Sequence, residues 1–395
     1  MTPTLVAALA ILAMVGPVAT DMYLPGLPGM RDDLLTTPGA VQLTLSLFML
    51  GMATGQLFWG PLSDALGRRG PLVVAASLFV VASGVAAVAD SIELLIVMRF
   101  VQGFLGTAGV VIGRAVARDL SSGAELAKLF SVIGIVMGIA PIAAPIVGGL
   151  LIDSIGWRGV LWVVTAIAAI MAAVAIVLIP ESLTSERRVA GSARQFFGTL
   201  GGIVRDVPYL GYVGVSIFTF GVVFAYISGS SVVLQEVYGL TSQQFTLVFA
   251  INMVGMMGVG ILNTRLVGRL GPSRLLTLGL GVLTIGGIAL GAIGLLGMVP
   301  PLWLLVALVF VTTTTMPMIN ANASALGLGR HGKGAGMAAA LMGSLQYGVA
   351  GLVSPMVTIT GEASVSSMAI VMLVCALLAS ASSLLYRRAK PVVDA

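Results

Sequence analysis

The sequence predicts an all-α integral membrane protein, and three observations lead to that prediction. Of the 395 residues, 58% are hydrophobic and only 9% are charged, whereas a soluble domain carries about 25% charged residues. Apolar stretches of about 20 residues recur along the whole chain, and each is long enough to cross a bilayer as a helix. The basic residues lie between alternate stretches. A soluble α-helical protein with unusually apolar helices does not fit these features.

Breaks at charged residues and at Gly/Pro clusters divide the chain into twelve candidate membrane spans. The first candidate lacks the basic start of a signal peptide and eleven more follow it, so we expect it to be retained. The candidate spans are residues 4–27, 41–62, 71–89, 92–115, 127–151, 158–179, 208–229, 243–262, 274–297, 301–322, 335–357 and 365–386.

The longest break between spans is charged and separates six spans from six. It indicates a cytoplasmic linker at residues 181–207, helical along the membrane surface around 196–204. We therefore expect an N-terminal six-helix bundle at 1–180, a C-terminal six-helix bundle at 208–386 and a cytoplasmic tail at 387–395.

The two halves also resemble each other in one short motif. "GPLSDALGRRG" (60–70), between spans two and three, has a counterpart in "TRLVGRLGPSR" (264–274), between spans eight and nine. The second copy has Gly268 where the first has Asp64, so it has lost the acid. Internal symmetry of this kind is typical of transporters that are built from two pseudo-symmetric bundles.

Lysine and arginine residues determine the predicted orientation. With both termini in the cytoplasm, all but three of the 20 basic residues fall in inner loops or the tail; Arg31 and Arg158 lie outside and Arg99 lies within a span. This bias is the one that the positive-inside rule describes. Basic loops beside an anionic leaflet also explain the net charge of +5 without a nucleic-acid partner. We expect a multi-pass protein of the bacterial plasma (inner) membrane.

Several motifs in the first half resemble those of one transporter family. "GPLSDALGRRG" is similar to the loop-2/3 signature of the major facilitator superfamily, and "RFVQG" (99–103) to its Arg-x-x-Gln-Gly motif. "GIAPIAAPIVGG" (138–149) resembles the Gly/Pro motif of its drug:proton antiporters. With "TDMYLPGLP" (20–28) and "ARDL" (117–120), the set resembles the Bcr/CflA-like multidrug efflux group. The resemblance implies the major facilitator fold, a monomer, and antiport by alternating access.

The loop-2/3 motif and the end of span four supply candidate gating residues. An Asp64–Arg68–Asp119 cluster is expected to hold the inner ends of the bundle together while the protein is open outward. In the alternative interpretation, the arginines only set topology and the acids are solvated. The full candidate set is Gly60, Asp64, Gly67, Arg68, Arg69, Arg118 and Asp119.

Small and helix-bending residues dominate the Gly/Pro motif of span five. Glycines allow helices to approach closely, and prolines bend them, so close packing alone can explain the pattern. The resemblance adds a sealed contact between the two halves that prevents leak. The residues concerned are Gly138, Pro141, Pro145, Gly148 and Gly149.

Asp21 is the one carboxylate within a span, and Arg99 is the one base well inside one. Both lie at similar depth, counted at ~1.5 Å per helical residue. In the facilitator fold, spans one and four line the same cavity, so we expect a direct or water-bridged Asp21–Arg99 pair to compensate both charges. Asp21 is then the proton carrier. A static ion pair that fixes packing is the alternative.

The remaining polar and soft side chains within spans are candidates for a substrate cavity, although helix packing explains many of them. With one buried acid, such a cavity favours neutral, amphipathic molecules, and the resemblance points to bicyclomycin- or chloramphenicol-like antibiotics. The candidates are Met22, Tyr23, Gln102, Tyr226, Asn252, Asn320, Asn322, Gln346 and Tyr347.

Other function classes fit the sequence poorly. With one histidine (His331) and one cysteine (Cys375), the chain has neither a zinc site nor a Cys–His pair, so we expect no enzyme and no metal. No Gly-rich loop with Gly-Lys-Ser/Thr is present, so we expect that ATP is not the energy source. The resemblance implies that the proton gradient supplies the energy and that no cofactor is needed. The alternative on the same fold is a proton-coupled symporter that imports a small nutrient.

Overall fold

The structure is a computed structural model that describes residues 2–188, 193–358 and 364–387. Throughout these residues the regular structure is helical, with no strand, which confirms the predicted all-α class. Of the expected tail, residues 388–395 lie outside the described part of the chain.

The described helices supply the expected twelve crossings. Eleven helical segments are long and apolar enough to cross a membrane, by length and composition. One of them, Lys128–Leu178, has 51 residues, which corresponds to about 75 Å of helix, far more than the ~30 Å of a bilayer core. It is interrupted at Gly156, whose φ of 66° and ψ of 177° are not helical. The turn at Gly156 therefore divides this segment into two spans.

The chain forms two compact units. The first unit comprises residues 1–191 and 234–250, and the second comprises 192–233 and 251–395. The expected division into bundles at a linker of 181–207 stays a prediction. The helices of the first unit are α1 (Pro3–Ala13), α2 (Val15–Asp21), the 3-10 turn η1 (Leu24–Gly26), α3 (Leu27–Asp33), α4 (Pro38–Leu66), α5 (Arg69–Ala87), α6 (Ile92–Leu120), α7 (Gly123–Leu178) and the 3-10 turn η2 (Ser185–Arg187).

The second unit contains the remaining helices, but two helical segments are divided between the two units. The π-helix η3 (Val233–Val237) ends in the first unit, and α10 (Ser242–Leu270) begins there. The others are α8 (Ala193–Val204), α9 (Val207–Val232), α11 (Pro272–Leu295), α12 (Leu302–Thr313), α13 (Met316–Leu328), the 3-10 turn η4 (Gly332–Gly334), α14 (Ala335–Met356) and α15 (Val365–Arg387).

Prolines explain why two expected spans are broken. The span expected at 4–27 is divided into α1, α2, η1 and α3, and the one expected at 301–322 into α12 and α13. A proline removes a helical hydrogen bond and clashes with the carbonyl four residues earlier. Pro17 and Pro317 lie four residues after Ala13 and Thr313, the residues at which α1 and α12 end.

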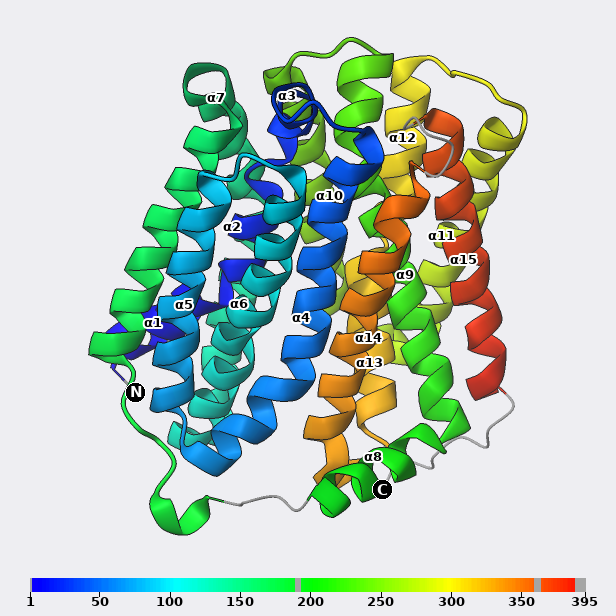
Figure 1. Ribbon diagram of the computed structural model, residues 1–395. Helices are drawn as coiled ribbons and strands as arrows, with labels where there is room; N and C mark the ends of the chain where they lie inside the picture. The colour runs from blue at the N-terminus through cyan, green and yellow to red at the C-terminus, as the bar shows by residue number, and fades with distance from the viewer. Residues whose placement is uncertain (1, 189–192, 359–363, 388–395) are drawn as a thin grey trace. The chain divides into compact units, whose positions relative to one another are not determined.

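Helices α4 and α6 run side by side in the first unit (Figure 1) and approach closely through glycines. A Cβ added to Gly103 would overlap the carbonyl oxygen of Phe48, and one added to Gly51 would overlap that of Phe100. Small residues at such crossings let backbones pack tightly in a membrane, where water supplies no driving force between helices.

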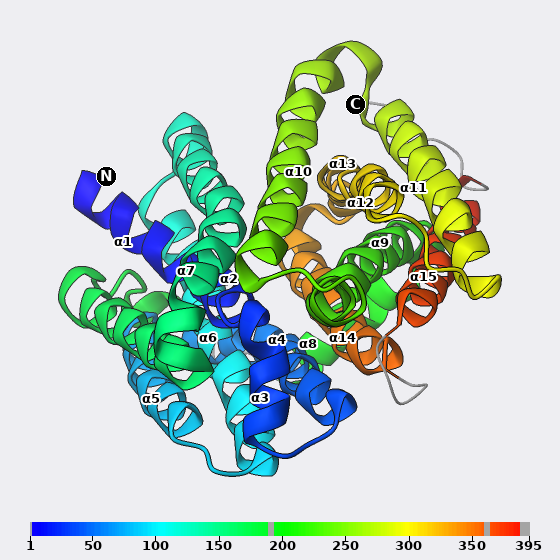
Figure 2. The same cartoon turned by 90° about the horizontal axis from the view of Figure 1, so that it is seen from above.

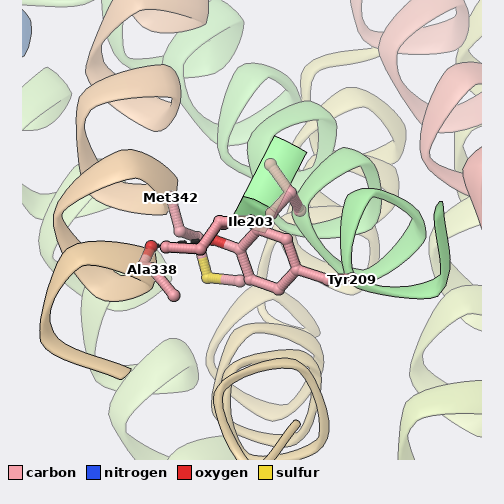
Figure 3. Close-up of a cluster of buried hydrophobic side chains, with 5 residues drawn as sticks. Ile203, Tyr209, Ala338 and Met342 are labelled. Carbon is pink, nitrogen blue, oxygen red and sulfur yellow. Dashed lines mark hydrogen bonds between the residues drawn. The ribbon is translucent and has the colours of Figure 1, made fainter. Parts of the chain in front are cut away.

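In the second unit, α9 packs against α13, α14 and α15, as seen along the helices in Figure 2. At one end of α9, Ile203, Tyr209, Val213, Ala338 and Met342 form a buried apolar cluster that joins α8, α9 and α14 (Figure 3). The Tyr209 hydroxyl donates to the carbonyl oxygen of Ala338 at 2.7 Å, which fixes this end of α14 against α9.

Asp206 caps the start of α9 and anchors the turn that precedes α14. It accepts two hydrogen bonds from the Arg330 guanidinium, at 2.8 and 3.0 Å, and one from the backbone N–H of Tyr209. Burial alone would raise the pKa of Asp206, but these donors hold it below the ordinary value. Asp206 therefore stays ionised and keeps this inter-helical tie at neutral pH.

The close approach of α4 and α6 leads to a testable expectation for Gly103→Ala. The added methyl group must displace the backbone at Phe48, and overpacking of this kind costs about 1–3 kcal/mol. We expect a lower melting temperature for the purified variant in detergent. Gly134→Ala is the control, because a Cβ there meets nothing within 4 Å. Equal melting temperatures for the two variants would contradict a tight crossing.

Candidate functional site

Asp21 is the last residue of α2, and its side chain is buried, with 6% of its surface exposed. The hydroxyl of Thr20 donates to its Oδ1 at 2.9 Å. Within the described part of the chain, no lysine, arginine or histidine lies within ion-pair distance of this carboxyl. The carboxyl is therefore held by a hydroxyl instead of a cation.

Arg99, on α6, is only 1% exposed and has a different set of partners. Its guanidinium lies between the rings of Tyr23 and Phe48, 4.5 Å from each centroid. Its terminal nitrogens donate to the carbonyl oxygen of Ala19 at 2.7 Å and to Gln102 Oε1 at 3.0 Å, while Nε has no hydrogen-bond partner. Cation–π contacts of this kind are strongest when the cation is desolvated.

The direct form of the expected Asp21–Arg99 pair is thus absent from the described residues, whereas the water-bridged form stays a prediction. Backbone carbonyls in the last turn of a helix have no partner within that helix. Ala19 lies in the last turn of α2, and its carbonyl takes the guanidinium that we expected Asp21 to bind. Arg99 nevertheless lies against the turn of α2 that carries Asp21.

The cavity candidates of the first half are all fully buried. Gln102 connects Arg99 to α5, because its Nε2 donates to Ser83 Oγ at 2.8 Å. The Tyr23 hydroxyl lies 3.1 Å from Thr44 Oγ1 on α4. Met22 packs against α7, where a Cβ at Gly148 would overlap its carbonyl oxygen. A role of Met22, Tyr23 and Gln102 in substrate binding stays a prediction.

The structure brings together the three side chains of the expected inner cluster. Arg68 is buried, and its Nε donates to Asp119 Oδ2 at 2.9 Å, while Nη1 donates to Asp64 Oδ1 and to Ser63 Oγ. Burial alone would lower the pKa of Arg68, but the bonds to Asp119 and Asp64 raise it above the ordinary value. Arg118 is exposed and takes no part.

Sequence reasoning missed Glu181, which completes this cluster from the end of α7. Its carboxylate accepts the backbone N–H groups of Arg68 at 2.9 Å, Arg69 at 3.2 Å and Leu183 at 3.0 Å. These donors approach closely because Gly67 adopts a φ of 99°, where a Cβ would meet the Glu181 carboxylate. The one signal in the sequence was an acid that directly follows span six.

Two glycines of the Gly/Pro motif, Gly148 and Gly149, make close contacts within the first unit. A Cβ on Gly149 would overlap Thr246 Oγ1 of α10, and that hydroxyl lies 3.5 Å from the carbonyl oxygen of Pro145. Gly138 borders open space instead. The motif therefore combines two tightly packed glycines with one, Gly138, at which a Cβ would find open space.

The cavity candidates of the second half separate into buried pairs and accessible groups. Asn252 bonds to Thr313 and Asn322 to Asn263, all of them buried. Tyr226 is also buried. Two half-buried amides, Asn320 and Gln346, both hydrogen-bond to Ser216 Oγ, at 2.7 Å each. The sequence did not single out Ser216. Tyr347 lies beside Phe220, with ring centroids 6.0 Å apart.

Comparison with known proteins gives consistent matches over most of the chain. Residues 9–355 match the Major Facilitator Superfamily. The chain is 33% identical to the uncharacterized MFS-type transporter YdgK of Bacillus subtilis, over 94% of this chain and 92% of the relative. It is 34% identical to a bicyclomycin resistance protein homolog of Haemophilus influenzae (71% and 70% covered) and 28% identical to a chloramphenicol resistance protein of Pseudomonas aeruginosa (74% and 70%).

Solved structures show the same fold at low identity. The partially occluded inward-open xylose transporter XylE from E. coli matches with a TM-score of 0.73 at 15% identity, over 98% of this chain and 99% of that chain. The nucleoside transporter NupG matches with a TM-score of 0.72 at 14% identity, over 97% and 99%.

The hydrogen bonds to Glu181 predict how stability depends on pH. Burial alone would raise its pKa, but three backbone N–H donors and Arg188 lower it below the model-compound value of 4.5. The depressed pKa means that Glu181 stabilises the fold above about pH 4.5 and loses this effect as pH falls through the folded pKa. We expect Glu181→Gln to lower the melting temperature at pH 7, and the gap in melting temperature between this variant and wild type to narrow as pH falls below about 4.5.

The matched control for this measurement is Glu186→Gln, because Glu186 is exposed like Glu181 but accepts none of the backbone N–H groups that bind Glu181. It is expected to melt like wild type at both pH values. A gap between Glu181→Gln and wild type that stays constant with pH would show that the charge of Glu181 is not what its donors stabilise.

Proposed function

Because the chain belongs to the major facilitator superfamily, we propose that it exports small, mostly neutral amphipathic drugs in exchange for protons. It is a multi-pass bacterial membrane protein whose relatives are named as drug and multidrug resistance transporters. The proposal adds the coupling ion, the direction and the substrate class. It places the protein in the inner membrane with both termini in the cytoplasm, as a monomer that needs no cofactor beyond the proton gradient.

The observation that carries the proposal is the buried carboxyl of Asp21, which has a hydroxyl partner and no cation partner. Desolvation penalises the charged form of such a group, so the carboxyl gains a proton where it is buried and loses it where water reaches it. An alternating cavity exposes the same carboxyl first to one side and then to the other. Asp21 is thereby suited to load a proton from outside and release it inside.

Arg99 is proposed to influence the gain and loss of the proton at Asp21, because it lies against the same turn of α2. Its charge is balanced by a carbonyl and two aromatic faces instead of by a carboxylate. A shift of α2 relative to α6 changes how strongly the cation stabilises the ionised form of Asp21. Binding of substrate and protonation of Asp21 then exclude each other, because each stabilises a different position of α2.

The inner cluster is proposed to act as the gate. Arg68, held by Asp64, Asp119 and the backbone contacts of Glu181, joins α4, α6 and the end of α7. Breaking these bonds allows the inner ends of the helices to separate.

The names of the relatives point to bicyclomycin- or chloramphenicol-like substrates, with export as the direction. The alternative, import of a small nutrient with protons, shares the fold of the D-xylose-proton symporter, which matches at 17% identity. That likeness concerns the fold alone. The direction of transport under an imposed proton gradient separates the two.

The test is drug-induced proton release in everted vesicles, with chloramphenicol and a lipophilic cation as probes. We expect wild type to release protons with chloramphenicol, and Asp21→Asn to release none while still binding it. Asp153→Asn, an exposed carboxyl, is the control and should behave like wild type. Proton release by Asp21→Asn at the wild-type level would remove the proposed carrier, and movement of drug and protons in the same direction would favour symport, the mechanism of the import alternative.

A further inference from the structure

The second unit contains two amide side chains with free hydrogen-bonding groups that are held in place by one hydroxyl. Ser216, on α9, is fully buried. Its hydroxyl donates to Asn320 Oδ1 on α13 at 2.7 Å and accepts from Gln346 Nε2 on α14, also at 2.7 Å. The single proton of Ser216 thus fixes which end of each amide points toward α9.

This arrangement leaves one donor and one acceptor unused. Asn320 retains its Nδ2 group, and Gln346 retains its Oε1 atom, neither of which bonds to another described residue. Neither atom is among the fully buried groups without a partner, and both side chains are half-buried. The pair therefore presents an accessible donor beside an accessible acceptor.

Contact with hydrocarbon is energetically unfavourable for an amide group that has no hydrogen-bond partner. An amide group that faces lipid without a partner costs several kcal/mol, and the other buried amides of this unit avoid that cost by pairing. Asn252 bonds to Thr313, and Asn322 to Asn263. The unused groups of Asn320 and Gln346 differ from these pairs, and that difference suits contact with a polar ligand.

The surroundings restrict the class of ligand. The three helices that carry these residues, α9, α13 and α14, contain no charged side chain. One turn after Ser216 on α9 lies Phe220, and its ring meets that of Tyr347, the neighbour of Gln346, edge to face. A neutral molecule with an aromatic or apolar body and a polar group that both accepts and donates fits such a surface.

We propose that Asn320 and Gln346, oriented by Ser216, bind the amide of a neutral substrate. Asn320 Nδ2 donates to the substrate carbonyl, and Gln346 Oε1 accepts its N–H. Ser216 is a positioning residue that does not touch the substrate. This inference rests on the proposed function for the kind of substrate, while its test needs neither a proton gradient nor transport.

The experiment is equilibrium binding of radiolabelled chloramphenicol, a neutral aromatic secondary amide, to the purified full-length protein in detergent. Its N-methylated analogue, which keeps the carbonyl but lacks the N–H, is the competitor. We expect wild type to prefer the secondary amide roughly two- to thirteenfold, which is the contribution of one hydrogen bond. Ser216→Ala should reduce this ratio toward one.

Two further variants keep the test decisive. Gln346→Met removes the acceptor with a side chain of similar length, so it too should lose the preference, even where Ser216→Ala does not fold. Ser228→Ala removes an equally buried hydroxyl of α9 that bonds within its own helix, and it should keep the wild-type ratio. A wild type without preference, or variants at Ser216 and Gln346 that both retain it, would overturn the proposal.

The outcome is separable from that of the antiport test. A wild type that prefers the secondary amide but releases no protons supports the amide site and contradicts proton-coupled export. A wild type that releases protons with chloramphenicol but binds both amides equally contradicts the amide site and leaves antiport standing.

Discussion

The buried guanidinium of Arg99 determines how the helices of the first unit are arranged around it. A cation in this environment needs partners on every side, and α6 alone does not supply them. The carbonyl of Ala19 on α2, the ring of Tyr23 next to α2, and the ring of Phe48 on α4 complete its environment. Gln102 extends the bonds to α5. One side chain thus links four helical segments.

This arrangement also explains why Asp21 is available for chemistry. A carboxylate bound directly to Arg99 would be fixed in its charged form. Because a backbone carbonyl takes that position, Asp21 keeps only a hydroxyl partner among the described residues, and this is the basis of its proposed role as proton carrier. The end of α2 at Asp21 leaves the Ala19 carbonyl without a helical partner, which makes this possible.

The polar side chains on three helices of the second unit are neutral. Its helices α9, α13 and α14 have no charged side chain, so amides and hydroxyls supply all the polarity there. Several of them bond to backbone carbonyls or to α10, as Tyr209 and Asn322 do, and Ser216 holds two amides that remain partly unsatisfied. The chain thereby places buried charge within the helices of the first unit and neutral hydrogen bonds along these three helices of the second, whose Asp206–Arg330 ion pair lies at helix ends.

The sequence by itself determined the membrane class, the twelve crossings and the family, because hydropathy and charge bias act on whole stretches of chain. It also identified Asp21 and Arg99, since a charge within an apolar stretch is visible without coordinates. It grouped Asp64, Arg68 and Asp119, which the structure joins. It missed Glu181 and Ser216, because a single acid after a span and a serine in a helix have no distinctive pattern.

Only the tertiary structure decided which partner each polar group takes. The sequence predicted an Asp21–Arg99 pair from the principle that buried charges are compensated, and the principle holds. However, a backbone carbonyl and aromatic faces can compensate a cation as well as a carboxylate does, and no sequence pattern distinguishes these partners. The choice depends on distances of a few ångströms between helices, which are set by close glycine contacts and proline breaks acting together.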